Sequence, residues 1–139
     1  MLCEIPKCIS PELMMTMMEM GHGDEIVFAD GDFPAKSLGK RVIRADGVMM
    51  QEMLDSILQL FPIDSSCMPI AVMAPWEQAA DPPIHSVMKS AFKKHCSSFE
   101  NYEYLERYAF YSRAKDAFAI VVTSEADGNF ILRKGVVNG

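Results

Sequence analysis

The chain has 139 residues, of which 50% are hydrophobic and 23% are charged, a composition typical of one globular domain with a buried core. Its net charge of -6 disfavours a nucleic acid or an anionic membrane as a partner, because either would require a basic surface. No apolar run is long enough to span a membrane, and Glu4, Pro6 and Lys7 interrupt the N-terminal residues before a secretory signal forms.

A helix is predicted to begin at Ser10, because a capping hydroxyl precedes a proline at the first helical position and a carboxylate in the first turn. Apolar residues at three-and-four spacing continue this helix, and Gly21 is expected to end it in a left-handed conformation. Residues 26–29 are predicted to form a short buried strand, and glycine and proline indicate a loop at residues 30–34.

The rest of the chain continues the alternation of strands and helices. The predicted strands are 41–44, 117–123 and 130–133, the predicted helices are 50–58, 82–94 and 111–116, and an apolar run covers 68–73. Such alternation indicates an α/β protein with a single domain over residues 1–139, in which ligands bind beyond the carboxyl ends of strands. Asp30 lies at one such end, and the turn at residues 127–129 follows another.

Cysteine usage predicts free thiols. The four cysteines form no CxxC pair, and the three histidines are scattered. This spacing indicates neither a zinc site nor a disulfide framework. We therefore expect no zinc site, and a reducing cytoplasm as the environment of the thiols, which belong to Cys3, Cys8, Cys67 and Cys96.

The stretch at residues 20–30 has the most unusual pattern, with His22 between two glycines, followed by two carboxylates, an apolar run and Asp30. One interpretation is an imidazole that the dipole of the preceding helix stabilises at the helix end. A second is an imidazole that a ligand or another chain segment approaches closely, because Gly23 has no side chain. A metal site made of His22, Asp24 and Asp30 is a third, although the spacing matches no known ligand pattern.

Arg107 and Asn129 are further candidates for a binding site. Arg107 precedes an aromatic run, so it either stacks on its neighbours or offers a forked donor to sugar hydroxyls or a carboxylate. Asn129 either forms a turn with Gly128 or supplies a donor and an acceptor to a ligand.

The chain has no P-loop, dinucleotide-binding fingerprint or GxSxG motif. These groups suit a small, uncharged, polyhydroxylated ligand and proton transfer without a cofactor.

The order of the motifs resembles the RbsD/FucU family, which contains L-fucose mutarotases and D-ribose pyranases. The most specific match is Met-Gly-His-Gly-Asp-Glu at residues 20–25 followed by Ile-Arg-Ala-Asp-Gly at residues 43–47, and it is closer to the fucose branch. The resemblance runs nearly end to end, with further matches within residues 9–13, 29–35, 110–119 and 128–136.

The resemblance implies a three-layer α/β/α sandwich. It also implies an isomerase that interconverts the α and β anomers of a free monosaccharide without a metal or a nucleotide. In this family pattern His22 is the catalytic acid/base, and Asp30 and Arg107 bind the sugar. Relatives assemble as homo-oligomers, either decameric rings or smaller assemblies, with sites near subunit contacts.

One departure from the family pattern concerns Asp127, Gly128 and Asn129, which correspond to a Tyr-Gly-Asn motif. A carboxylate thus replaces a tyrosine, in a shorter loop. We expect Asp127 to line the sugar site near His22; the alternative is that it points into water and only shapes the turn. If the tyrosine is essential, the chain is instead a non-catalytic monosaccharide-binding or transport-associated protein on the same scaffold.

Overall fold

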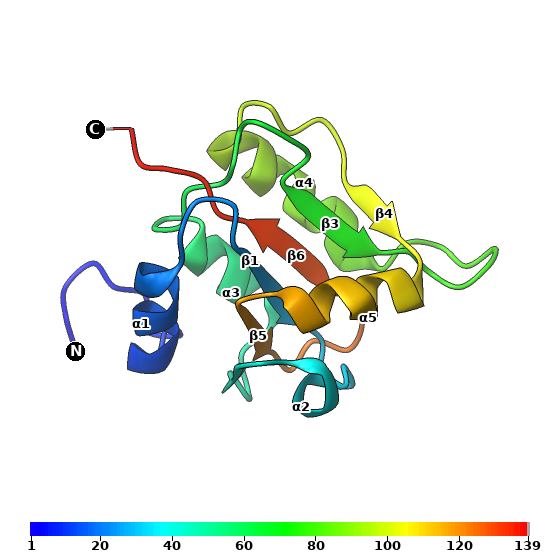
Figure 1. Cartoon of the computed structure of the whole chain (residues 1–139), viewed down its shortest axis with the longest axis horizontal. Coiled ribbons are helices and arrows are strands. Elements are labelled where there is room, and N and C mark those ends of the chain that lie inside the picture. The colour runs from blue at the N-terminus through cyan, green and yellow to red at the C-terminus, as the bar shows by residue number, and fades with distance from the viewer. Residues whose placement is uncertain (139) are drawn as a thin grey trace.

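The computed structural model describes residues 1–138 and consists of alternating helices and strands (Figure 1). The helices are α1 (Pro11–Glu19), α2 (Ala35–Leu38), α3 (Met50–Ile57), α4 (Pro83–His95) and α5 (Arg107–Asp116). The strands are β1 (Glu25–Ala29), β2 (Val42–Arg44), β3 (Ile70–Met73), β4 (Glu103–Leu105), β5 (Ala119–Val122) and β6 (Phe130–Arg133). The α/β class expected from the sequence is therefore confirmed.

Within residues 1–138 the strands form one mixed sheet in the order β2-β5-β1-β6-β3-β4. β1 and β5, β2 and β5, and β3 and β4 pair in parallel, whereas β6 lies between β1 and β3 and is antiparallel to both. We call the end of the sheet where β1 to β5 finish and β6 begins the carboxyl edge, and the opposite end the amino edge. The reversed β6 brings the turn before it to the carboxyl edge, next to the residue that follows β1.

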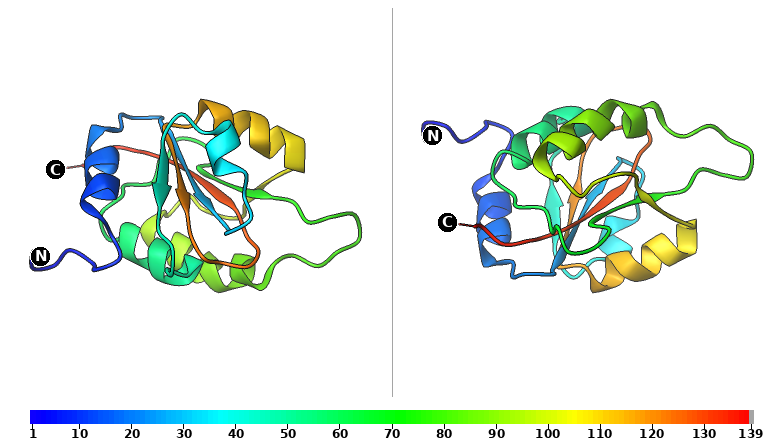
Figure 2. Two further views of the ribbon diagram at one scale, coloured as in Figure 1. Left: turned by 90° about the horizontal axis from the view of Figure 1, so that it is seen from below. Right: turned by 90° about the horizontal axis from the view of Figure 1, so that it is seen from above.

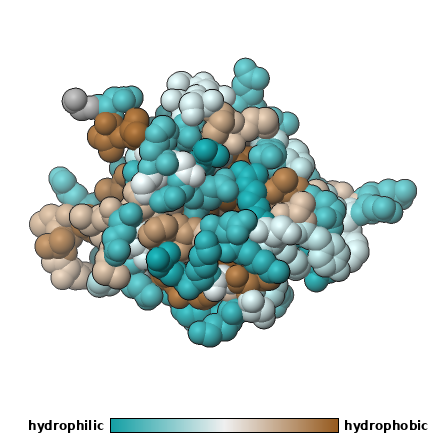
Figure 3. All heavy atoms as spheres, viewed as in Figure 1, coloured by the Kyte–Doolittle hydropathy of each residue, from teal (hydrophilic) through white to brown (hydrophobic). Residues whose placement is uncertain are grey.

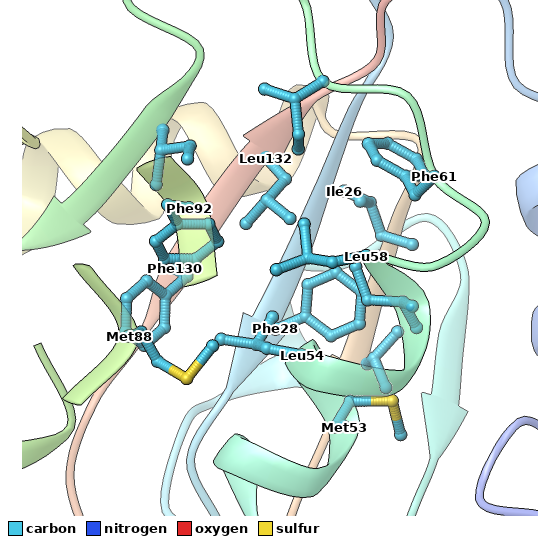
Figure 4. Packing of buried hydrophobic residues seen from close by; sticks show 14 of the residues in the cluster. Ile26, Phe28, Met53, Leu54, Leu58, Phe61, Met88, Phe92, Phe130 and Leu132 are labelled. Atoms are coloured by element: carbon cyan, nitrogen blue, oxygen red, sulfur yellow. The ribbon is translucent and has the colours of Figure 1, made fainter. Parts of the chain in front are cut away.

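Helices cover both faces of the sheet, so the predicted three-layer sandwich is present (Figure 2). The side chains of β1 alternate between the faces, as expected for a central strand. Phe28 points into the larger core, where it packs with Leu54, Met88 and Phe130 from α3, α4 and β6 (Figure 4). Val27 points to the other face, into a second core that includes residues of α2 and α5. None of the helices in residues 1–138 is long and apolar enough to cross a membrane.

The ends of two helices differ from the sequence-based prediction. The capping side chain of Ser10 and the start of α1 are as expected, but α1 ends at an extended Met20 and Gly21 is not left-handed. The left-handed residue is Gly23, with φ of 89°. Helix α5 begins at Arg107, four residues before the expected position 111, because the Glu106 carboxylate caps it by accepting hydrogen bonds from the backbone amides of Tyr108 and Ala109.

Candidate functional site

Asp30 and Asn129 form a buried pair at the carboxyl edge. They follow β1 and precede β6, and the antiparallel register of those strands places them side by side. The Asp30 amide donates to Asn129 Oδ1 at 2.9 Å, and Asn129 Nδ2 donates to Asp30 Oδ2 at 2.9 Å. The Gly128 amide also donates to Asp30 Oδ2, at 3.3 Å. These bonds fix the turn at residues 127–129 against the end of β1.

The Asp30 carboxyl group has an unusual electrostatic environment. Its burial raises its pKa, and the hydrogen bonds from Asn129, Gly128 and Asp32 only partly offset that effect. The nearby Asp127 carboxylate raises the pKa of Asp30 further. A carboxyl group with a raised pKa holds its proton to higher pH than an exposed aspartate, which favours exchange of hydrogen bonds with neutral hydroxyls.

A cavity of about 710 Å³ lies in front of this turn, at the carboxyl edge. Its size is within the usual range for small-molecule sites. Three segments line it: the loop between β3 and α4, the start of α5, and the turn before β6. The loop extends away from the body of the molecule (Figure 2). The lining includes Trp76, Arg107, Tyr108, Asp127, Gly128 and Asn129.

Arg107 lies among aromatic rings at the mouth of this cavity. Its guanidinium carbon is 5.3 Å from the centre of the Tyr111 ring, 5.5 Å from that of Tyr108 and 5.8 Å from that of Trp76. Its Nε donates to the Tyr111 hydroxyl at 2.9 Å. The stacked arrangement is therefore present, and it holds an exposed forked donor beside the cavity.

His22 lies at the amino edge. The backbone amide of Gly23 donates to the Lys134 carbonyl at 2.8 Å, so the loop that carries His22 is fixed to the end of β6. The imidazole is 56% exposed, and its Nε2 is 3.6 Å from Asp64 Oδ2. Asp30 follows the other end of β1, and the four residue steps of that strand alone span about 13 Å.

The structure thus divides the predicted site residues into two groups. Asp30, Arg107 and residues 127–129 meet at the carboxyl edge, where Asp127 lines the cavity. Within one chain, His22 meets none of them, so the expected proximity of Asp127 to His22 is wrong for a single chain. The alternative metal site of His22, Asp24 and Asp30 fails for the same reason, and residues 1–138 contain no cluster of three side chains that could hold a metal ion.

Sequence reasoning missed three residues near these sites. Trp76 lines the cavity. It is the single tryptophan of the chain, and that rarity could have marked it as a candidate. Asp64 contacts His22, but nothing in their spacing indicates it. His85, 1% exposed, packs its ring on Phe130 and Tyr102, and its burial lowers its pKa, so the ring is neutral at neutral pH.

Comparisons with known proteins agree in fold and in sequence. The profile of the RbsD / FucU transport protein family matches residues 3–137. The fucose mutarotase of Streptococcus pneumoniae, solved in complex with L-fucose, is 45% identical with a TM-score of 0.93, and the match covers 99% of this chain and 100% of that one.

Two further solved structures are similar. FucU from Bifidobacterium longum is 42% identical with a TM-score of 0.89, over 97% of this chain and 99% of that one. RbsD from Bacillus subtilis, solved with D-ribose, is 23% identical with a TM-score of 0.69, over 94% and 95% of the two chains, a likeness of fold alone.

Proposed function

The chain belongs to the RbsD/FucU family, and from this premise we propose that it is a sugar mutarotase, an isomerase that interconverts the α and β anomers of L-fucose or a related monosaccharide. The observation that carries the proposal is the end-to-end match, at 45% identity, to a fucose mutarotase whose structure holds L-fucose. The cavity at the carboxyl edge supports it, because amide, carboxyl and guanidinium groups there suit the hydroxyls of a neutral sugar.

The reaction requires two proton transfers and no redox step. One group protonates the ring oxygen while another removes the proton of the anomeric hydroxyl, and the bond between the anomeric carbon and the ring oxygen breaks. The open aldehyde rotates, and the hydroxyl adds to its other face with the two transfers reversed. An imidazole suits both directions because it titrates near neutral pH, so we assign His22 as the acid/base.

The groups at the carboxyl edge bind and orient the sugar. The pair of Asp30 and Asn129 offers both donors and acceptors to adjacent hydroxyls, and Arg107 offers a fork of donors. Trp76, 77% exposed beside the cavity, provides an aromatic face for the apolar side of the ring. Asp127 accepts a hydrogen bond from a sugar hydroxyl, at a position where the family pattern has a tyrosine.

Because His22 lies at the amino edge, we propose that the complete site combines the cavity of one chain with His22 of a second copy. Such a site requires a homo-oligomer, in size up to the decamers of the family. Exposed apolar side chains supply surface for assembly, and Figure 3 shows hydrophobic residues near both termini. The exposed apolar side chains of the described residues include Met1, Leu2, Met15, Met18 and Val137. Four free thiols agree with a cytoplasmic location.

Saturation-transfer NMR on the anomeric protons tests the activity directly. We expect exchange faster than in a heat-inactivated control with L-fucose, and comparison with D-ribose, D-galactose and D-glucose ranks the substrates. His22→Gln is expected to lower the rate by about 10²–10⁴-fold with little change in sugar affinity. The competing function, a sugar-binding protein with little catalysis, predicts saturable binding of the sugar without exchange above the control.

Co-expression of two inactive variants tests the shared site. His22→Gln removes the acid/base, and Arg107→Ala removes an exposed binding group. If the site is shared, random assembly of the two chains makes about one quarter of the sites complete and restores that share of activity. If each site lies in one chain, the mixture is no more active than the two variants assayed separately.

A further inference from the structure

A buried carboxylate outside the sugar cavity lies beside His22. Asp64 is at the amino edge and is only 3% exposed. Its Oδ1 accepts hydrogen bonds from the Ser66 amide at 2.9 Å and from the Ser66 hydroxyl at 2.7 Å. These bonds fix one oxygen of the carboxylate within its own loop. The other oxygen, Oδ2, accepts from that loop only a long bond of 3.8 Å from the Cys67 thiol, and it faces groups from elsewhere in the chain.

Two nitrogen atoms approach Oδ2 of Asp64. Arg133 Nε lies 3.2 Å away, in ion-pair contact without the alignment of a hydrogen bond. His22 Nε2 lies 3.6 Å away, a few tenths of an ångström beyond hydrogen-bond length, so a small rotation of the exposed ring brings it within range. The hydrogen bonds from Ser66, helped by His22, lower the pKa of Asp64 to about 2, against the opposing effect of burial. Asp64 is therefore ionised at neutral pH and acts only as a hydrogen-bond acceptor.

Backbone hydrogen bonds fix the separation of the two side chains. The Gly23 amide donates to the Lys134 carbonyl at 2.8 Å, and the Asp64 amide donates to the Arg133 carbonyl at 3.0 Å. Both loops are thus joined to consecutive residues at the end of β6. The packing there is close, since a Cβ atom on Gly135 would lie 2.8 Å from the Ile63 carbonyl oxygen. The approach of His22 to Asp64 consequently follows from the fold rather than from two mobile surface chains.

We propose that Asp64 is a positioning residue for His22: it accepts a hydrogen bond from the Nε2–H group and leaves Nδ1 as the nitrogen that exchanges protons with the sugar. This inference rests on the proposed role of His22. In a neutral imidazole one nitrogen carries the proton and the other is the base, and the hydrogen bond made by the first decides which is which. The same contact restrains the orientation of a ring that is otherwise half exposed.

A purely structural role for Asp64 is the competing explanation. The hydrogen bonds to Ser66 close a turn, and Arg133 needs a counter-ion, so Asp64 has functions without His22. The two explanations predict different kinetics. A structural role affects stability and every property that depends on it, whereas positioning affects turnover only through His22.

Asp64→Asn is the most informative change, because an asparagine retains an oxygen for the Ser66 bonds and presents an NH₂ group to His22. That group donates to Nε2 and favours the opposite tautomer, with the proton on Nδ1. We expect kcat to fall by at least about tenfold with KM unchanged. Nitrogen-15 NMR of the imidazole, assigned with His22→Gln, is expected to show protonated Nε2 in the parent and its loss in Asp64→Asn.

Three controls make the result decisive. Asp24→Asn removes an equal charge two residues from His22 and is expected to change kcat less than about twofold. Ser66→Ala removes the hydroxyl bond but keeps the carboxylate and the bond from the amide of residue 66, so it measures the effect of a loosened turn on the rate. In a His22→Gln background, Asp64→Asn is expected to have no further effect on the rate, because both changes act through one group.

Two results would overturn the proposal. One is an equal loss of rate when Asp64→Asn is made in the parent and in His22→Gln, and the other is an unchanged tautomer of the His22 imidazole in Asp64→Asn. The proposed function has a separate test. If His22→Gln exchanges anomers at the parent rate, His22 is not the acid/base, while the nitrogen-15 spectra still decide whether Asp64 selects its tautomer.

Discussion

Gly128→Ala is predicted to destabilise the protein by about 2–6 kcal/mol, because two costs coincide at this turn. Gly128 has φ of 135°, which residues with a side chain rarely adopt. A Cβ atom there would also clash with Cγ2 of Ile84, a buried side chain in the first turn of α4. Backbone strain contributes about 1–3 kcal/mol and overpacking about as much again.

Gly47→Ala is the matched control for this prediction. Gly47 has φ of 88°, and its added Cβ would meet no atom within 4 Å, so the change introduces backbone strain alone. Urea unfolding of both variants, at one protein concentration because assembly contributes to stability, is expected to show a larger loss for Gly128→Ala by about 1–3 kcal/mol. Equal losses would refute the reasoning, since they would mean that Ile84 moves aside without cost.

Three further predictions concern charge and assembly. Burial raises the pKa of Asp30, and the Asp127 carboxylate raises it further; Asp127→Tyr removes that charge. Any limb of the pH–rate profile that follows the ionisation of Asp30 is therefore expected to move to lower pH. The ranking of sugars in the NMR assay is also expected to change. Because the pKa of Asp64 is lowered to about 2, its ionised form stabilises the fold by about 2 kcal/mol above pH 4. Urea unfolding is expected to show that this stabilisation is lost between pH 4 and pH 2 in the parent but not in Asp64→Asn. Light scattering is expected to give a multiple of the chain mass; a monomer at micromolar concentration would contradict the shared site.

Much of the fold was predictable because its strongest signals are local. The hydroxyl of Ser10 and the proline after it define the start of α1, and the apolar run before Asp30 defines β1. Two elements, α2 and β4, were not predicted. They have four and three residues, too few for a helical or alternating pattern to show.

The site was only partly predictable, because it depends on contacts between distant segments. The sequence placed Asp30 and the turn at residues 127–129 at strand ends, but their hydrogen bonds require β6 to run antiparallel beside β1. Local patterns carry no such information. The pairing of His22 with Asp64 has the same origin, because each of their loops is bonded to the end of β6.

The position of the sheet between the two groups constrains how the enzyme works. The ends of β1 are hydrogen-bonded to their neighbours, so no local movement brings His22 to Asp30 across about 13 Å of central strand. In the proposed shared site, a second copy removes that obstacle, because its amino edge lies against the carboxyl edge of the first. In such an arrangement the contact between chains sets the distance between the acid/base and the sugar, a quantity to which catalysis is highly sensitive. Surface residues that touch neither group, such as Met15 and Met18, then influence turnover through assembly alone.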